Sequence, residues 1–239
     1  MGRAFEYRKA RKFARWGAMA KTFTKIGKEI GIAVKEGGTD PNYNSRLRAA
    51  VNNAKKANMP KTTVDSAIKN ASSKDAENYA EVVYEGYGPF GIAVMVETTT
   101  NNTTRTVANI RMHFNKCGGQ LGTFGSVDFM FVRKSVFRVK KEALPDYEEL
   151  EFEMIDFGLD EIKDEGDVWA IYANFTDFGT MQKFLEDKNI DIDESGLERI
   201  PTTTKALNDE ETEAIFKLID RLEEDEDVAN VFTTMDMSE

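Results

Sequence analysis

The stretch NDEETEAIFKLIDRLEEDEDVANVFT, residues 208–233, decides how the chain is divided, because it predicts a helix followed directly by a strand. Asn208 and Glu211 have the spacing of a capping box, in which each side chain bonds the other residue's backbone N–H. The helix would bury a stripe of aliphatic side chains, namely Ile215, Leu218, Ile219 and Leu222. Residues 228–233 then form a final strand.

Strand and helix patterns alternate twice before this stretch. The first cycle has strands at 81–85 and 91–98, a helix at 103–116 and a strand at 126–132. The second has a strand at 135–140, a helix opening at Pro145, a strand at 168–173, a helix at 176–188 and an extended stretch at 190–201. The first cycle lacks a last helix and strand, which 208–235 would supply. The second cycle is then an insertion within a split α+β domain.

Residues 1–75 have a helical pattern throughout. At about 100° per residue, Lys21, Lys25, Lys28 and Lys35 share one helix face and the apolar residues lie opposite. Gly37 and Gly38 end this helix, a second follows Pro41, and a third, short helix follows Pro60. The pattern predicts a small helical bundle with one cationic surface.

Charge is distributed unevenly along the chain. Residues 1–75 hold 17 Lys and Arg against 6 Asp and Glu, a net charge of +11. The other residues hold 15 against 36, a net charge of −21. A basic module on an acidic body indicates binding to nucleic acid through the basic part only, since the acidic body repels polyanions.

Basic side chains of the helical part are therefore the candidate nucleic-acid contacts, each able to displace a counterion from a phosphate. The candidates are Arg8, Lys9, Arg11, Lys12, Arg15, Lys21, Lys25, Lys28, Arg46, Arg48, Lys55, Lys56, Lys61 and Lys69. Among them lie Phe5, Tyr7, Phe13 and Trp16, which could stack on bases or form the apolar face of the first helix.

Other motifs point away from catalysis. The match to G-x-G-x-x-G at 86–91 is followed by a strand rather than a helix and contains Pro89, so a tight hairpin turn is favoured over a dinucleotide site. His113 and Cys117, the only residues of their kinds, do not make a zinc tetrad, and no third group completes a nucleophilic pair. The acidic run 223–227 lacks the spacing of a calcium loop and is expected to be a solvated helix end.

Composition bounds the remaining choices. The chain has 239 residues, 41 % of them hydrophobic, which suits two or three domains. One cysteine excludes an internal disulfide, and the longest apolar run, 92–96, is far too short for a bilayer. The basic N-terminus resembles a transit peptide, but it contains Glu6 and has no serine before Ser45. We expect a cytoplasmic protein with no membrane partner, cofactor, metal or catalytic site.

Several motifs together resemble the YebC/PmpR family of probable transcriptional regulatory proteins. They are LRAA at 47–50, KKANMPK at 55–61, AIK at 67–69, YEGYGP at 84–89, NTTRTVA at 102–108, and GG at 118–119 leading to GSV at 125–127 and MF at 130–131. The usual Gly-His-Ser-Lys-Trp opening is replaced by GRAFEYR at 2–8, which looks like one branch of the family.

The resemblance implies an α+β multidomain fold with an N-terminal helical bundle and two α+β domains. The third domain is ferredoxin-like and inserted in the second. The expected boundaries are 1–75, 76–133 with 206–239, and 134–205. The resemblance also implies a non-enzymatic, cytoplasmic regulator that binds DNA and controls transcription. The alternative is a translational activator that contacts rRNA or tRNA on the ribosome. A second alternative is a protein–protein adaptor whose charged halves serve solubility and partner choice.

Overall fold

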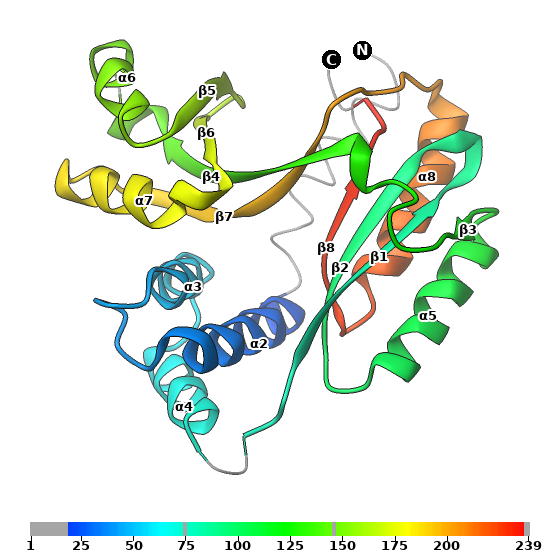
Figure 1. The fold of residues 1–239 in the computed structure, drawn as a ribbon, viewed down its shortest axis with the longest axis horizontal. Helices are drawn as coiled ribbons and strands as arrows, with labels where there is room; N and C mark the ends of the chain where they lie inside the picture. The colour runs from blue at the N-terminus through cyan, green and yellow to red at the C-terminus, as the bar shows by residue number, and fades with distance from the viewer. Residues whose placement is uncertain (1–18, 74–75, 145–146, 237–239) are drawn as a thin grey trace. The chain divides into compact units, whose positions relative to one another are not determined.

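The computed structural model describes residues 19–73, 76–144 and 147–236, which form helices and two four-stranded antiparallel sheets (Figure 1). This confirms the predicted α+β class. Contacts divide the chain into two compact units. The first comprises the described residues of 1–28, 77–132 and 200–239, and the second comprises 29–76 and 133–199. The division falls within α2 (Met19–Gly37), immediately after Lys28. The predicted domain boundaries stay a prediction.

The sheet of the first unit has the strand order β3-β1-β2-β8, and each neighbouring pair is antiparallel. Its strands are β1 (Ala80–Tyr87), β2 (Ala93–Thr100), β3 (Gln120–Leu121) and β8 (Val228–Thr233). Its helices are α5 (Thr103–Lys116) and α8 (Asp209–Glu223). The segment 208–233 thus forms a helix and a strand as predicted, and Asn208 and Glu211 make the capping box.

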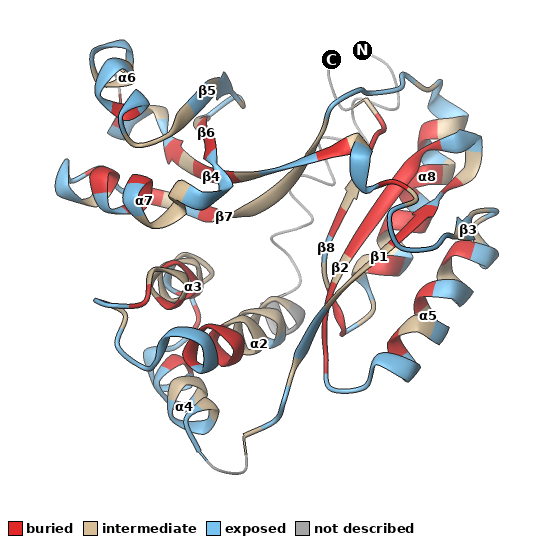
Figure 2. Ribbon diagram, viewed as in Figure 1, coloured by how far each residue is buried: buried red, intermediate tan, exposed pale blue. Residues whose placement is uncertain are grey.

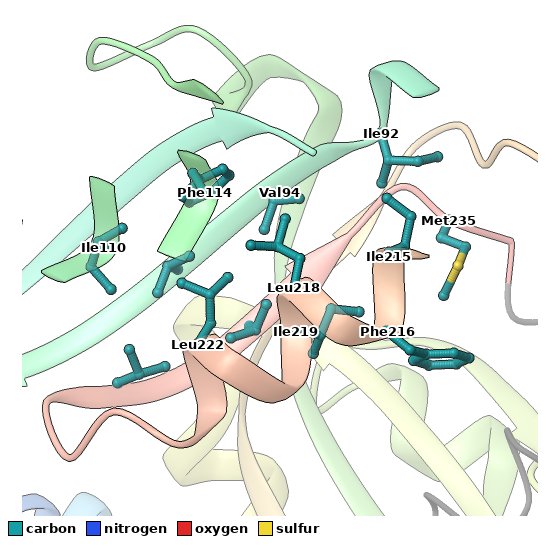
Figure 3. Packing of buried hydrophobic residues seen from close by; sticks show 13 residues of the cluster. Ile92, Val94, Ile110, Phe114, Ile215, Phe216, Leu218, Ile219, Leu222 and Met235 are labelled. Atoms are coloured by element: carbon teal, nitrogen blue, oxygen red, sulfur yellow. The ribbon is translucent and has the colours of Figure 1, made fainter. Parts of the chain in front are cut away.

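The main core of this unit lies between the sheet and its two helices. In Figure 3, Ile215 and Leu218 of α8 lie beside Ile92 and Val94. Phe114 of α5 is fully buried in the same cluster. The alternate side chains of β2, Ala93 and Met95, are buried on the opposite face with Val127 and Phe131. β2 is therefore buried along nearly its whole length, as Figure 2 shows.

The sheet of the second unit has the order β5-β6-β4-β7. The chain runs through β4 (Phe131–Lys140), α6 (Tyr147–Ile155), β5 (Leu159–Asp164), β6 (Val168–Asn174), α7 (Phe178–Asp187) and β7 (Ile192–Pro201). This β-α-β-β-α-β succession with the first strand beside the third is the ferredoxin-like arrangement. Fully buried Phe137, Met154 and Leu185 anchor its core.

The second unit also contains helices from the basic part of the chain. They are the end of α2, α3 (Ser45–Lys56) and α4 (Lys61–Ala71). Asn44 caps α3, and Asn58, with φ of 59°, turns the chain between α3 and α4. On its other side α3 contacts α7, and the Asn53 side chain donates to the Ser195 carbonyl over 2.7 Å.

Three local expectations are wrong. Residues 126–132 are not one strand, because a 3₁₀ turn (Asp128–Met130) precedes β4. The predictions also omitted β5, whose residues are mostly exposed and charged. The acidic run is not simply a solvated helix end, since Asp227 is 4 % exposed and holds an internal hydrogen-bond network.

Short 3₁₀ turns complete the described part of the chain. They are η1 (Pro89–Gly91), η2 (Asp128–Met130), η3 (Lys141–Ala143) and η4 (Phe175–Asp177). The first of them lies in the hairpin between β1 and β2, where the Gly88 N–H donates to the Ile92 carbonyl over 2.8 Å. The glycine motif at 86–91 is therefore a tight hairpin, as predicted.

Candidate nucleic-acid interface

A groove of about 940 Å³ lies between α3, α4 and the loop before α3, entirely within the second unit. Its lining residues are Thr39, Pro41, Val51, Lys55, Asn58, Met59, Lys61, Val64, Asp65, Ile68, Lys69 and Ser72. Figure 1 shows α3 and α4 beside each other at this place. The sequence forms the groove because the positive φ of Asn58 and the ring of Pro60 end one helix and start the next.

Three predicted contacts, Lys55, Lys61 and Lys69, line this groove with exposed side chains. None of them forms an ion pair within the described residues, although Asp65 shares the lining. Lys61 and Lys69 come from the two ends of α4, and Lys55 comes from the last turn of α3. Three ammonium groups around one hollow make a site where a polyanion gains favourable contacts and releases counterions.

The other predicted contacts on α3 are engaged within the protein. Arg46 binds Glu29 over 2.7 Å and Glu36 over 2.8 Å. Arg48 Nε lies 3.2 Å from Glu186 Oε1 of α7, so the two side chains form an ion pair. The angles at Nε do not allow a hydrogen bond there.

Lys56 also faces the ferredoxin-like sheet. It binds Asp191 over 2.6 Å and lies 3.6 Å from Asp193. Together with Arg48, it forms a charge-complementary contact of α3 with α7 and the start of β7. The predicted continuous cationic surface is thus divided into residues paired within the chain and residues that line the groove.

Two lysines of α2 in the first unit, Lys25 and Lys28, contact the end of α8 and the acidic turn after it. Lys25 Nζ lies 3.5 Å from the Glu223 carbonyl oxygen. Lys28 Nζ donates to Asp227 Oδ1 over 3.0 Å, and also to the carbonyl oxygens of Thr99 and Glu226 over 3.1 and 2.7 Å. With its donors engaged, Lys28 stabilises the fold of the first unit.

The remaining predicted contacts cannot be placed by their side chains. Arg8, Lys9, Arg11, Lys12 and Arg15 lie outside the described residues, as do the four candidate stacking aromatics near them. Lys21 lies in α2, but its side chain is also outside the described part.

Sequence reasoning did not single out two buried carboxylates, Glu85 and Asp227. Glu85 is 3 % exposed and accepts hydrogen bonds from the backbone N–H groups of Gly125, Val127 and Asp128 over 2.7–2.9 Å. The only available signal for Glu85 was a charged residue at an inward position of a strand pattern.

The one histidine of the chain faces a carboxylate within the first unit. His113 Nε2 lies 3.4 Å from Asp225, on the inner side of α5. Residues 19–73, 76–144 and 147–236 contain no group of His, Cys, Asp or Glu suited to hold a metal ion. Over the same ranges, no helix combines the length and the apolar character needed to cross a membrane.

The fold and this groove define an α+β protein with a lysine-lined groove between two of its helices, and comparisons with known proteins give its family. Residues 3–74 match the TACO1/YebC protein N-terminal domain, and residues 79–235 match the TACO1/YebC second and third domain. The chain belongs to the TACO1/YebC family, which confirms the resemblance seen in its motifs.

Individual relatives agree over nearly the full length. A probable transcriptional regulatory protein of Flavobacterium johnsoniae is 57 % identical over 235 residues, covering 98 % of this chain and 99 % of the relative. One from Parabacteroides distasonis is 55 % identical, with coverage of 98 % and 97 %. The crystal structure of conserved hypothetical protein Aq1575 from Aquifex aeolicus has a TM-score of 0.83 at 37 % identity, covering 93 % of this chain and 92 % of that one.

Proposed function

We propose that this protein is a non-enzymatic, cytoplasmic regulator of gene expression that binds nucleic acid through the groove between α3 and α4. The observation that carries this proposal is the convergence of Lys55, Lys61 and Lys69 on one hollow without internal ion pairs among the described residues. The relatives named as probable transcriptional regulatory proteins support a regulatory role and favour DNA as the target.

RNA is the second candidate target, because the groove is not lined by cations alone. Val51, Met59 and Ile68 also line it, and an apolar surface can contact the face of an unpaired base. A duplex mainly presents phosphates to such a site. The apolar lining therefore favours the alternative of a translational activator, in which the protein contacts rRNA or tRNA on the ribosome.

The test is a change of charge confined to the groove. We expect Lys55→Glu/Lys61→Glu/Lys69→Glu to weaken binding to labelled duplex DNA, single-stranded DNA and structured RNA strongly in fluorescence anisotropy titrations, with affinities still measurable at low salt. In the unmodified protein, log K should fall linearly with log salt concentration. The slope should flatten by about 0.7 to 0.9 for each phosphate contact removed.

A matched control separates the groove from net charge. Lys116→Glu/Lys140→Glu/Lys183→Glu makes the same change of charge at three exposed lysines outside the groove. We expect the control to retain most of the affinity and the original salt slope. Equal losses in both triple variants would overturn the assignment to the groove, and no polyanion binding by the unmodified protein would favour the adaptor alternative. The tightest of the three nucleic acids decides between DNA and RNA.

A further inference from the structure

Four aromatic side chains of the first unit are exposed in two short segments. Phe124 is 92 % exposed and Phe129 is 74 % exposed in the segment between β3 and β4. Phe90 and Tyr87, at the hairpin between β1 and β2, are 44 % and 38 % exposed. An exposed phenylalanine forfeits the stabilisation of burial. Single exposed rings are common on protein surfaces, but here four aromatic side chains share two segments that a hydrogen bond joins.

Phe124 stands at the tip of a defined turn. The Ser126 N–H donates to the Thr123 carbonyl over 3.1 Å, which closes a four-residue β-turn. Gly125 follows Phe124 with φ of 80°, a conformation that glycine adopts without strain. Phe124 therefore occupies the position from which a side chain points away from the turn.

The buried carboxylate of Glu85 fixes this turn to the sheet. It accepts from the Gly125 and Val127 N–H groups over 2.7 Å each, and from Asp128 over 2.9 Å. The Glu85 carbonyl accepts from the Gly122 N–H over 2.7 Å as well. The chain on both sides of Phe124 is thus held in one arrangement, and the ring is presented by a rigid backbone.

Hydrogen bonds also connect the two aromatic segments to each other and to a lysine. The Tyr87 hydroxyl donates to the Ser126 carbonyl over 3.1 Å, which places its ring beside the turn of Phe124. Lys205 Nζ donates to the Phe90 carbonyl over 2.6 Å and is exposed. An ammonium has three N–H donors, so with this one bond among the described residues Lys205 can also donate to a ligand. We call Tyr87, Phe90, Phe124, Phe129 and Lys205 the aromatic rim.

We propose that the aromatic rim is a stacking platform for unpaired bases of a single-stranded nucleic acid. The proposal rests on the proposed function and adds a ligand class and a second contact surface. This surface lies outside residues 1–75, the part to which the charge distribution alone assigned nucleic-acid binding. A base supplies its own π face, so it can stack on a lone ring without a surrounding apolar patch. Lys205 supplies the positive charge that a neighbouring phosphate needs, and the negative charges beside the turn are Asp128 and the buried carboxylate of Glu85.

A protein partner is less suited to the same surface. Protein interfaces place their aromatic anchors in a well-packed centre from which water is excluded. Here the residues next to Phe124 in the chain are Gly122, Thr123, Gly125 and Ser126, which are small or polar. The Phe124 ring thus offers its faces to the solvent, which suits stacking.

Phe124→Ala tests the platform, with Phe152→Ala as the matched control. Phe152 is 79 % exposed on α6 of the second unit. We expect Phe124→Ala to weaken binding of a labelled 12-nucleotide oligouridylate by about 5- to 100-fold, because one base stack contributes that much. Duplex DNA of the same length should bind as before, and Phe152→Ala should change neither. Phe124→Trp should restore the affinity for the oligouridylate.

The salt dependence separates this proposal from the proposed function. A stacking contact releases no counterion, so Phe124→Ala should leave the slope of log K against log salt unchanged. The groove triple variant should flatten that slope. If Phe124→Ala binds the oligouridylate with normal affinity while the groove triple variant has a flattened salt slope, the stacking platform is wrong. The assignment of binding to the groove would then still stand. A loss of a protein partner without a loss of RNA affinity would likewise overturn the platform.

Discussion

Lys28 and Asp227 form an ion pair of 3.0 Å in which both side chains are largely buried, with exposed fractions of 13 % and 5 %. The other carboxylate oxygen of Asp227 accepts from Arg105 over 2.7 Å and from the Thr106 hydroxyl over 2.9 Å. Two cations and a hydroxyl thus surround one buried carboxylate. This cluster ties the middle of α2 and the start of α5 to the turn between α8 and β8.

The first prediction concerns the stability that this ion pair confers. Lys28→Met removes one partner and leaves the Asp227 charge buried and less compensated, a change that typically costs about 3–5 kcal/mol. We expect a lower free energy of unfolding in urea, with the loss reported by a probe in the first unit. Lys217→Met is the control, because Lys217 forms an exposed pair with Glu213 and should change stability by less than about 1 kcal/mol. Equal effects of the two variants would contradict this assignment.

The second prediction concerns pH. Burial raises the pKa of the Asp227 carboxyl, but hydrogen bonds from Arg105, Lys28 and Thr106 outweigh burial and hold this pKa below its ordinary value. A carboxyl with a lowered pKa in the folded state stabilises the protein above its unfolded pKa of about 3.9. That stability is lost as pH falls through the folded pKa.

Thermal unfolding of the protein and of Asp227→Asn at several pH values measures this effect. We expect the difference in stability between them to be constant near neutral pH and to shrink as pH falls below about 4. A difference that persists unchanged at the lowest pH at which the protein folds would show that the Asp227 charge does not stabilise the first unit.

The third prediction concerns the carboxylate under the turn of Phe124. Glu85→Ala leaves the N–H groups of Gly125, Val127 and Asp128 without their acceptor. We expect a loss of about 3 kcal/mol in the free energy of unfolding, because unsatisfied buried donors are costly. Faster amide hydrogen exchange at residues 122–128 should accompany it. Glu81→Ala changes an exposed residue of the same strand and should leave both readouts nearly unchanged.

Much of the fold could be predicted from local patterns. The stripe from Ile215 to Leu222 and the capping box of Asn208 identified α8, and the strand predicted at 228–233 has those bounds in β8. These signals depend on residues a few positions apart. The missed elements depend on distant residues: the carboxylate of Glu85 accepts from Val127, 42 positions along the chain, which favours a turn over a continued strand.

The candidate site shows the same limit. Helical periodicity identified the basic side chains of α3 but not what faces them. Lys56 and Asp191 are 135 residues apart, so no local pattern pairs them. The net charges of residues 1–75 and 76–239 are misleading here, because acidic residues of the second segment form ion pairs with basic residues of the first. Lys55, one position earlier on α3, faces the groove instead and retains the predicted exposure.

The last prediction concerns Asn44, which joins the end of α2 to the start of α3. Its side-chain oxygen accepts from the Leu47 N–H over 3.0 Å, and its amide donates to the carbonyls of Ala33 and Gly38 over 2.6 and 2.9 Å. Asn44→Ala removes the helix cap and leaves the buried Ala33 carbonyl without this donor. We expect a loss of about 2–3 kcal/mol in the free energy of unfolding.

Two further variants make this prediction specific. Asn44→Asp keeps the cap acceptor but removes both donors and brings a negative charge toward two carbonyl oxygens, so it should not restore stability. Asn42→Ala is the matched control, since Asn42 is exposed and its side chain bonds only Asp40 among the described residues. Because Asn44 fixes the loop that leads into α3, Asn44→Ala should also weaken nucleic-acid binding at the groove under conditions where the variant remains folded. Full affinity in a folded Asn44→Ala variant would show that the groove does not depend on this cap.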